Sequence, residues 1–442
     1  MTDFKRKDGV HLHVIKETKF KTVRMMVRFR EEITPEHLGK RVLLSNLLET
    51  TNAIYPTGKA FSRRLSELFG ASFTTGVAKK GKQHLLSLNM TVVNPTLVDF
   101  DTLKAGVDFL RAVLFAPDVK EGAFNPFIFK REQTNLIHYL EAMNDDRAYY
   151  ASRQLAQEFF KDPKQALPSV GTVELIERET PQAVFDYYQE MLKTNVIDIF
   201  VLGDVDEARV HKLFSDFDFA QNVENSSFKG GKAPTQVLEH TDLFYEQELT
   251  ERSVLTEAKE ATQSILQLGY HLPVQYGDAN YMTLQVLNGL LGGFSHSKLF
   301  KNVREKESLA YSISSTFDSF TGFLKIAAGI DAVNFEAARE LIAAQLEALQ
   351  EGDFSPADLE QTKTMLRNTY LVGQDSISNT IELEYVKALL PERYLPTEVF
   401  LSQLTAVSAE EVARLAQKLT LQVEYFMKGT VGMNEREESL AQ

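Results

Sequence analysis

The sequence predicts an α+β protein built from two tandem homologous halves, each a mostly antiparallel sheet with helices packed on one side. Similar segments recur at a shift of roughly 230–240 residues, where residues 61–73 align with 300–312 and residues 132–134 align with 360–362. In each half, two strand patterns are joined by a short turn that contains glycine, which is typical of an antiparallel hairpin. Long helical patterns accompany each hairpin and are expected to cover one sheet face. We expect the two halves to form a clam-like protomer.

Apolar residues with a period of 2 or of 3.6 distinguish strands from helices along the first half. Its strands are expected at residues 23–29, 72–78, 84–93 and 196–202. Its helices are expected at residues 35–51, 59–69, 97–115, 124–143, 145–160 and 181–192. The hairpin turn of this half contains Gly81.

The second half repeats the order of element types. Its strands are expected at residues 264–271, 309–317 and 323–330. Its helices are expected at residues 278–291, 296–306, 335–349, 356–372 and 381–390. Between the halves, the polar stretch NVENSSFKGGKAP is rich in Ser and Gly, which is typical of a flexible connector. We therefore expect an N-terminal half at 1–221, a linker at 222–243 and a C-terminal half at 244–442.

Composition limits the class of protein. The chain has 442 residues, of which 43% are hydrophobic, and its formal net charge is −13. A chain of this length is expected to form more than one domain. Without cysteine it has neither a disulfide scaffold nor a thiolate metal site. The acidic balance argues against nucleic-acid binding. No apolar run approaches the roughly 20 residues that span a bilayer, so we expect no membrane insertion and a soluble, cytoplasmic protein.

The residues themselves do not assemble an obvious catalytic site. A catalytic zinc site needs at least three good ligands, and none of the nine histidines forms a His-x-x-x-His pair. His11 and His13 would project from the same face of a strand, as a two-ligand site or as two solvated side chains. Glu36-His37 resembles the end of a zinc-binding helix motif, but Ile33 occupies the first ligand position. There is neither a Gly-x-Ser-x-Gly nor a phosphate-loop motif.

Two windows of sequence carry a resemblance to a known family. The first is residues 46–57 (NLLETTNAIYPT), followed by residues 65–71 (LSELFGA). The second is residues 292–300 (GGFSHSKLF), followed by residues 304–312 (REKESLAYS). Together with the duplication, these windows resemble the insulinase/pitrilysin-type metallopeptidases, the inverted zincins. The resemblance extends over almost the whole chain and is more specific in the second window.

The resemblance implies a zinc site that this chain has lost. Counting back from Tyr55-Pro56, the family's His-x-x-Glu-His falls on Val42-Leu43-Leu44-Ser45-Asn46. The family's third ligand, a Glu in a later helix, falls on His138-Tyr139. The degenerate site would therefore consist of Val42, Ser45, Asn46, His138 and Tyr139. We expect no bound metal and no catalytic residue in this chain.

A second feature of the family is retained. There, an Arg and a Tyr in the second half reach the substrate near the zinc, and the matching residues are Arg304 and Tyr311. An Arg presents a planar fork of donors, and a phenol OH can polarise a carbonyl. The alternative is a surface Arg in a salt bridge and a buried Tyr. The stretch 292–294 is either a flexible contact with peptide or a helix end and turn.

These features imply a non-catalytic subunit of a heterodimeric zinc peptidase. A homologous catalytic subunit would supply the zinc, and this chain would help to bind and enclose an unstructured peptide substrate. In isolation the chain could form a homodimer. A second hypothesis is a peptide-binding or scaffold protein without a protease partner. A third is a self-sufficient peptidase with a displaced metal site, around His138 or around His11 and His13.

Overall fold

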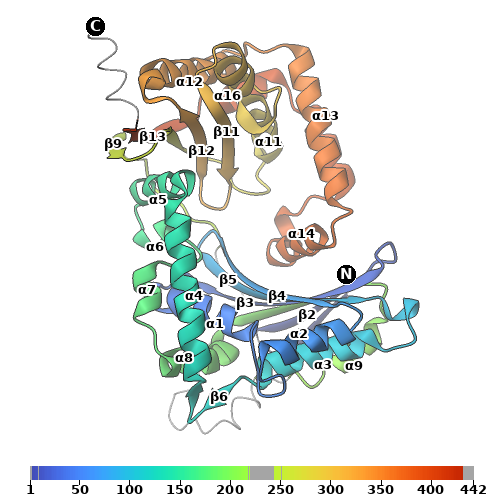
Figure 1. Cartoon of the computed structure of the whole chain (residues 1–442). Coiled ribbons are helices and arrows are strands. Elements are labelled where there is room, and N and C mark those ends of the chain that lie inside the picture. Colours follow the sequence, from blue (N-terminus) through green and yellow to red (C-terminus); the bar gives the residue numbers. More distant parts are fainter. Residues whose placement is uncertain (1, 8, 218, 220–242, 250, 432–442) are drawn as a thin grey trace. The chain divides into compact units, whose positions relative to one another are not determined.

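The computed structural model of the chain describes residues 2–7, 9–217, 219, 243–249 and 251–431 (Figure 1). The expected linker, apart from Leu243, lies outside these described residues. By its contacts the chain divides into two compact units. The first unit is Met1–Ala142 with Leu167–Leu243, and the second is Met143–Ala166 with Phe244–Gln442.

The first unit contains a six-stranded sheet in the order β1-β2-β8-β3-β5-β4. Its strands are β1 (Thr2–Lys7), β2 (Val10–Lys16), β3 (Thr22–Glu32), β4 (Ser72–Lys80), β5 (Gln83–Val93) and β8 (Val196–Gly203). Neighbouring strands are antiparallel, except that β2 and β8 run parallel. Every residue of β8 is buried because this strand lies inside the sheet, between β2 and β3. β4 forms one edge of the sheet.

Helices cover the apolar face of this sheet (Figure 1). The helices of the first unit are α1 (Pro35–Leu48), α2 (Gly58–Glu67), α3 (Thr102–Phe115), α4 (Pro126–Asp145), α7 (Val173–Glu177), α8 (Pro181–Thr194) and α9 (Glu207–Leu213). A short hairpin, β6 (Val119–Lys120) and β7 (Ala123–Phe124), precedes α4. Under the helices, Val27 lies between Leu88 and Ile199 in the strand register, and all three are fully buried. Burial of such side chains drives the packing of helix on sheet.

The second unit contains a five-stranded sheet in the order β11-β12-β10-β13-β9. Its strands are β9 (Ser253–Lys259), β10 (Ser264–His271), β11 (Ala310–Asp318), β12 (Phe323–Ile330) and β13 (Thr420–Gly429). Here too the neighbours are antiparallel, except that β9 and β13 run parallel.

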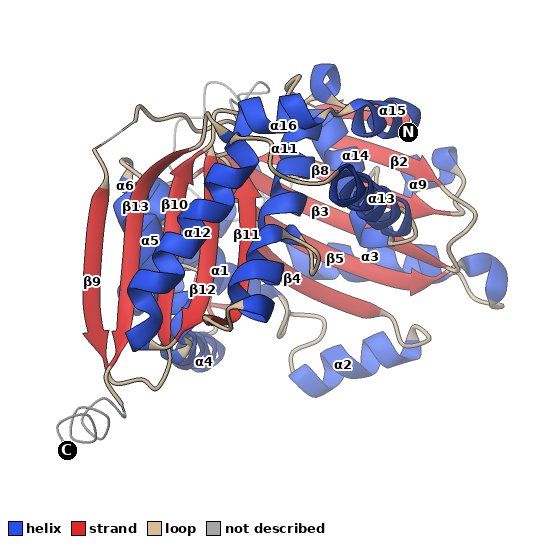
Figure 2. Cartoon of the chain, turned by 90° about the horizontal axis from the view of Figure 1, so that it is seen from above, coloured by secondary structure: helices blue, strands red, loops and turns tan. Residues whose placement is uncertain are grey.

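Helices lie on both faces of the second sheet (Figure 2). The helices of this unit are α5 (Arg147–Phe159), α6 (Pro163–Ala166), α11 (Tyr281–Asn288), α12 (Phe335–Gln350), α13 (Pro356–Gly373), α14 (Ile377–Leu389), α15 (Thr397–Ala406) and α16 (Ala409–Ala416). Two π-helical segments are η2 (Gly289–Gly293) and η3 (Leu299–Lys306). One face packs through Leu268 and Ile326 against α11, α12 and α16.

The opposite face of the second sheet packs against α5. Leu155 and Phe159 of this helix join Ile265, Val423 and Met427 in a second apolar cluster. Alternate residues of a strand point to opposite faces, so Ile265 and its neighbour Leu266 belong to different clusters. A helix from the first half of the sequence thus completes the second unit.

The two sheets share one topology, as the duplication predicts. The order β2-β8-β3-β5-β4 in the first unit matches β9-β13-β10-β12-β11 in the second. The parallel pair occupies the same place in both sheets. The aligned segments 61–73 and 300–312 both run from a helix into an edge strand, α2 into β4 and η3 into β11.

The expected strands all occur, and the expected helices occur with shifted ends. Residues 264–271 and 323–330 match β10 and β12 residue for residue. The expected helix 278–291 is divided into α11 and the π-helical η2. In the part of the chain that the structure describes, no helix is both long and apolar enough to cross a membrane.

Candidate functional site

Helix α1 presents three of the predicted site residues on one face. Pro35 occupies its first turn, where a missing N–H costs nothing. Val42, Ser45 and Asn46 follow at spacings of three and four residues, which places them on neighbouring turns of one side. Val42 and Ser45 are buried, and Asn46 is partly exposed. These side chains therefore form a short polar and apolar surface beside β4.

A cavity of about 470 Å³ opens on this face of α1. It lies between α1, the edge strand β4 and α4. Its walls are Val42, Ser45, Asn46, Glu49, Thr75, Gly76, Val77, Asn135, Leu136, Tyr139 and Val170. Four of the five residues predicted for the degenerate site therefore line one cavity.

Two neighbouring residues of α4, His138 and Tyr139, are candidates for the position of the family's third zinc ligand, and the helix places them differently. Tyr139 lines the cavity together with Asn135, one turn earlier on the same face. His138 is exposed and does not belong to the lining. The helical rotation between neighbouring residues thus separates His138 from the other predicted site residues, while Tyr139 joins them.

Glu49 is the acidic residue among those that line the cavity, and its carboxylate already has partners. The backbone N–H of Thr75 donates to Glu49 Oε2 at 2.7 Å, and the Thr75 hydroxyl lies 2.7 Å from the same oxygen. This contact joins the end of α1 to the edge strand β4. Sequence reasoning missed it because only the fold brings Glu49 and Thr75 together.

The donor set of the cavity does not suit zinc. Structural and catalytic zinc sites use imidazole, thiolate and carboxylate ligands. Here the corresponding side chains are a valine, a serine, an asparagine and a tyrosine, and the carboxylate of Glu49 is held by Thr75. Across the described ranges, no group of three or more His, Cys, Asp or Glu side chains is placed to hold a metal ion.

Behind the cavity, a buried polar network fixes the position of α1. Arg41 is 1% exposed, and its Nε donates to His84 Nδ1 at 2.8 Å. Its Nη1 donates to the Tyr187 hydroxyl at 2.6 Å and to Asn195 Oδ1 at 2.7 Å. Glu31 accepts hydrogen bonds from Tyr187 at 3.0 Å and from Asn195 at 2.9 Å. One signal in the sequence is an Arg directly before the apolar run Val42-Leu43-Leu44 of α1.

The network contains two groups whose pKa is lowered, Glu31 and His84. Burial alone would raise the pKa of Glu31, but the Arg41 guanidinium and His37 lower it to about 2. Burial and the same guanidinium lower the pKa of His84 to about 3. His84 is therefore neutral, with Nδ1 accepting from Arg41 and Nε2 donating to the Ser169 carbonyl at 3.0 Å. The network provides a rigid support for α1 at neutral pH.

Arg304 and Tyr311 lie in the second unit, at the corner where η3 leads into β11. The Arg304 guanidinium carbon lies 4.6 Å from the centre of the Phe300 ring, and its Nε lies 3.6 Å from Glu305 Oε1. Tyr311 is 60% exposed and is therefore not a buried core tyrosine. The pairing of β11 with β12 shifts register between Ala310 and Ser312, so Tyr311 sits on a bulge. Bulges at sheet edges re-aim a side chain.

The glycine-rich stretch before this corner is closely packed. A Cβ on Gly292 would come within 2.6 Å of the Ser315 backbone nitrogen, and one on Gly289 within 2.6 Å of Thr362 Cγ2. Both glycines are buried in η2. These contacts favour the interpretation as a helix end and turn over a flexible contact with peptide.

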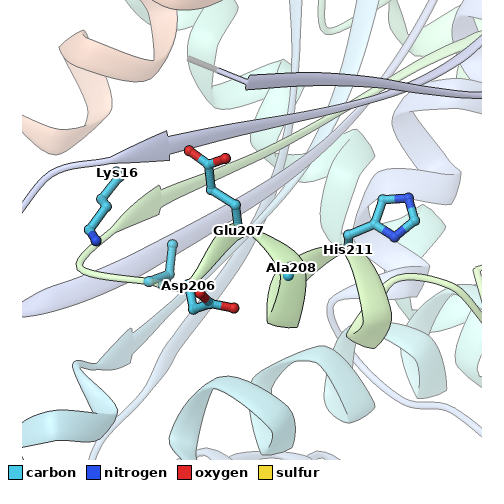
Figure 3. A pocket seen from close by; sticks show the side chains of 6 residues that line it. Lys16, Asp206, Glu207, Ala208 and His211 are labelled. Atoms are coloured by element: carbon cyan, nitrogen blue, oxygen red, sulfur yellow. The ribbon is translucent and has the colours of Figure 1, made fainter.

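The remaining histidine candidates occupy other surroundings. The rings of His11 and His13 stack with centroids 6.2 Å apart on β2, and His13 Nε2 lies 3.6 Å from Asp198 Oδ1. A further cavity of about 550 Å³ is lined by Lys16, Val205, Asp206, Glu207, Ala208 and His211 (Figure 3). It combines a lysine with two carboxylates at the surface and includes none of the predicted site residues.

Sequence and structure comparisons connect the chain to known proteins. Residues 178–366 match the family described as the peptidase M16 inactive domain. The chain is 32% identical over 426 residues to the probable inactive metalloprotease YmfF of Bacillus subtilis, covering 96% of this chain and 97% of that protein. It is 26% identical over 294 residues to the uncharacterized zinc protease YmxG of the same organism, covering 66% and 67%. A crystal structure of a conserved protein from Enterococcus faecalis is 40% identical, with a TM-score of 0.89 over 97% and 98% of the two chains.

Proposed function

The chain belongs to the M16 family of peptidases, and on that basis we propose that it is a non-catalytic subunit of a heterodimeric zinc peptidase. In this role it helps to bind and enclose an unstructured peptide, while a homologous partner subunit supplies the metal. The observation that carries the proposal is the cavity beside α1. Val42, Ser45, Asn46 and Tyr139 line it, at the positions where the family resemblance implies a zinc site.

The chemistry of these residues supports a role without catalysis. Peptide hydrolysis by zinc requires three protein ligands, an open coordination position and a base that activates water. Valine has no donor atom, and the hydroxyl and amide groups of Ser45, Asn46 and Tyr139 are poor ligands for zinc. The similarity to a relative named as a probable inactive metalloprotease agrees with this reasoning.

The edge strand β4 supports a peptide-binding role. Thr75, Gly76 and Val77 of β4 line the cavity, and this strand ends the sheet. An extended peptide can add to such an edge through backbone hydrogen bonds, with little dependence on its sequence. A Cβ on Gly76 would meet no atom within 4 Å, so the face of the sheet is open at this residue. The cavity can then receive a side chain of the peptide.

Arg304 and Tyr311 are the residues that we assign to substrate contact in the complex. Both are exposed donors at one corner of the second unit. In the proposed complex they bind the substrate backbone or the developing oxyanion at the zinc of the partner subunit. Preorganised donors of this kind stabilise a tetrahedral intermediate.

The central experiment is co-expression with a homologous zinc peptidase from the same genome. We expect the two chains to purify together, and a mixture to cleave an unstructured peptide faster than either chain alone. Chelation of zinc should abolish that activity. Chelator-sensitive cleavage by this chain alone would contradict the proposal. Purification with peptide but without a zinc-containing homologue would favour a peptide-binding scaffold instead.

Two substitutions test the assignment of Arg304 and Tyr311. Arg304→Ala or Tyr311→Phe in the complex should lower turnover by on the order of a hundredfold, the cost of losing one oxyanion donor. Size-exclusion chromatography should show that the complex still forms. Lys306→Ala is the matched control, because Lys306 is a more exposed cation at the end of the same segment. Unchanged cleavage in both variants would remove these residues from the proposed mechanism.

A further inference from the structure

The unpaired edge of β4 presents the backbone N–H of Thr75, which affects the peptides that can bind there. In the sheet order β4 has β5 as its neighbour, and no strand pairs with its other side among the described residues. Backbone groups of an antiparallel strand point alternately toward the partner and away from it. The N–H of Thr75 points away from β5, because it donates to Glu49 across the cavity wall. Thr75 thus presents the kind of donor that an added peptide strand needs.

The Glu49 carboxylate occupies the position of a peptide carbonyl. Its Oε2 accepts from the Thr75 N–H at 2.7 Å, a distance typical of a charge-assisted hydrogen bond. The Thr75 hydroxyl approaches the same oxygen at 2.7 Å. A peptide strand that pairs with Thr75 must therefore displace Glu49.

The end of α1 is an electrostatically unfavourable place for the carboxylate of Glu49. It is the C-terminal capping residue, and the last turn of the helix contains no basic residue. The negative end of the helix dipole disfavours a carboxylate there. The contacts with Thr75 offset this effect, and a displaced Glu49 leaves an exposed negative charge beside the strand edge.

The walls of the cavity supply no cation for this charge. The described residues that line it include hydroxyl and amide groups but no Lys, Arg or His. Glu49 is exposed, and its displaced carboxylate stays beside the bound strand. A peptide that brings a cation therefore gains a charge-assisted contact that a neutral peptide lacks. Resting on the proposed peptide-binding function, we propose that Glu49 makes the β4 edge selective for extended peptides that carry a Lys or Arg side chain.

Binding of matched peptides to the full chain tests this selectivity. The probes are two fluorescein-labelled nine-residue peptides of Ser and Val that differ only at the central position, Lys in one and Gln in the other. Fluorescence anisotropy at one fixed salt concentration gives their dissociation constants. We expect the wild-type chain to bind the Lys peptide about threefold to fivefold more tightly, the range that an exposed ion pair supplies. In Glu49→Gln the ratio should fall to about one, since a neutral amide cannot form an ion pair with Lys.

The control variant is Glu36→Gln, which removes the same charge from the first turn of α1. Glu36 lies about 20 Å from Glu49 along the helix axis, given the rise per residue. This variant should keep the preference for Lys, which separates the effect from the net charge of −13. Equal binding of both peptides to the wild type, or an unchanged ratio in Glu49→Gln, overturns the selectivity alone. If neither peptide binds any variant, the peptide-binding function fails as well.

Discussion

At the scale of single residues, Arg41 is the centre of the structure around the cavity. Its guanidinium is buried and meets His84, Tyr187 and Asn195, while Glu31 balances its charge from 3.4 Å. A buried charge is tolerated only when it is paired and hydrogen-bonded. The network therefore stabilises the first unit most when Glu31 is ionised and His84 is neutral.

We predict that this network makes the free energy of unfolding fall in acid. The folded pKa of His84 is about 3 against an ordinary 6.5, so its contribution is complete above pH 6.5 and is lost as the pH falls toward 3. The folded pKa of Glu31 is about 2 against 4.5, so its contribution is lost between pH 4.5 and 2. Urea unfolding at several pH values measures both.

His84→Gln isolates the contribution of the histidine. Between pH 6.5 and 4.5 the free energy of unfolding of this variant should fall less steeply than that of the wild type. His138→Gln is the control, since His138 is exposed and should leave the slope unchanged. Parallel pH profiles for the wild type and His84→Gln would show that His84 is not kept neutral by the fold.

At the scale of elements, the sequence predicts strands well where apolar residues alternate cleanly. The predicted bounds of β10 and β12 are correct to the residue, but the pattern predicts neither β9 nor β13. β9 is an edge strand with alternating exposed side chains. β13 contains the buried Glu424, which bonds to Arg252 and breaks the apolar pattern. Buried polar residues with distant partners hide a strand from pattern analysis.

The sequence likewise predicts only some of the residues that line the cavity. Counting from Tyr55-Pro56 placed Val42, Ser45 and Asn46, and the structure brings them together with Tyr139. Asn135 and the contact of Glu49 with Thr75 were missed, because they depend on the rotation of α4 and on how α1 packs against β4. His138 and Tyr139 are neighbours in sequence, and only the rotation of the helix separates their surroundings.

Rebuilding the metal site tests this placement. We predict that a chain with Val42→His, Ser45→Glu, Asn46→His and Tyr139→Glu binds zinc, because the three ligands of the family then face one cavity. The matched variant carries His138→Glu in place of Tyr139→Glu. It should bind zinc more weakly by on the order of a hundredfold, since its carboxylate lies outside the cavity. Isothermal titration calorimetry compares them, and equal affinities would mean that α4 is rotated differently.

At the scale of the whole molecule, the boundary between sequence halves and the boundary between compact units differ. Residues 143–166 precede the linker but pack with the second unit. The reason is the second face of the five-stranded sheet, where Ile265, Val423 and Met427 would be exposed without α5. The second sheet is thus covered on both faces only when the first half of the chain contributes its helix.

We predict that the stability of the second unit depends on α5. Leu155→Ala should lower the free energy of unfolding by about 2–5 kcal/mol, because Leu155 is fully buried in the cluster. Urea unfolding followed by circular dichroism measures the change. Gln157→Ala, on the exposed side of the same helix, should change it by less than about 0.5 kcal/mol. Equal effects of the two substitutions would indicate that α5 does not support the sheet.

This arrangement has a consequence for the order of events during synthesis. The ribosome releases α5 long before β13, which lies inside the second sheet and is the last described strand of the chain. Until β13 emerges, the apolar side chains of Ala151, Leu155 and Phe159 lack the part of their cover that Val423, Tyr425 and Met427 supply. A nascent chain that stalls after its midpoint would expose this apolar face of α5. Chaperones and proteases recognise exposed apolar surface of this kind.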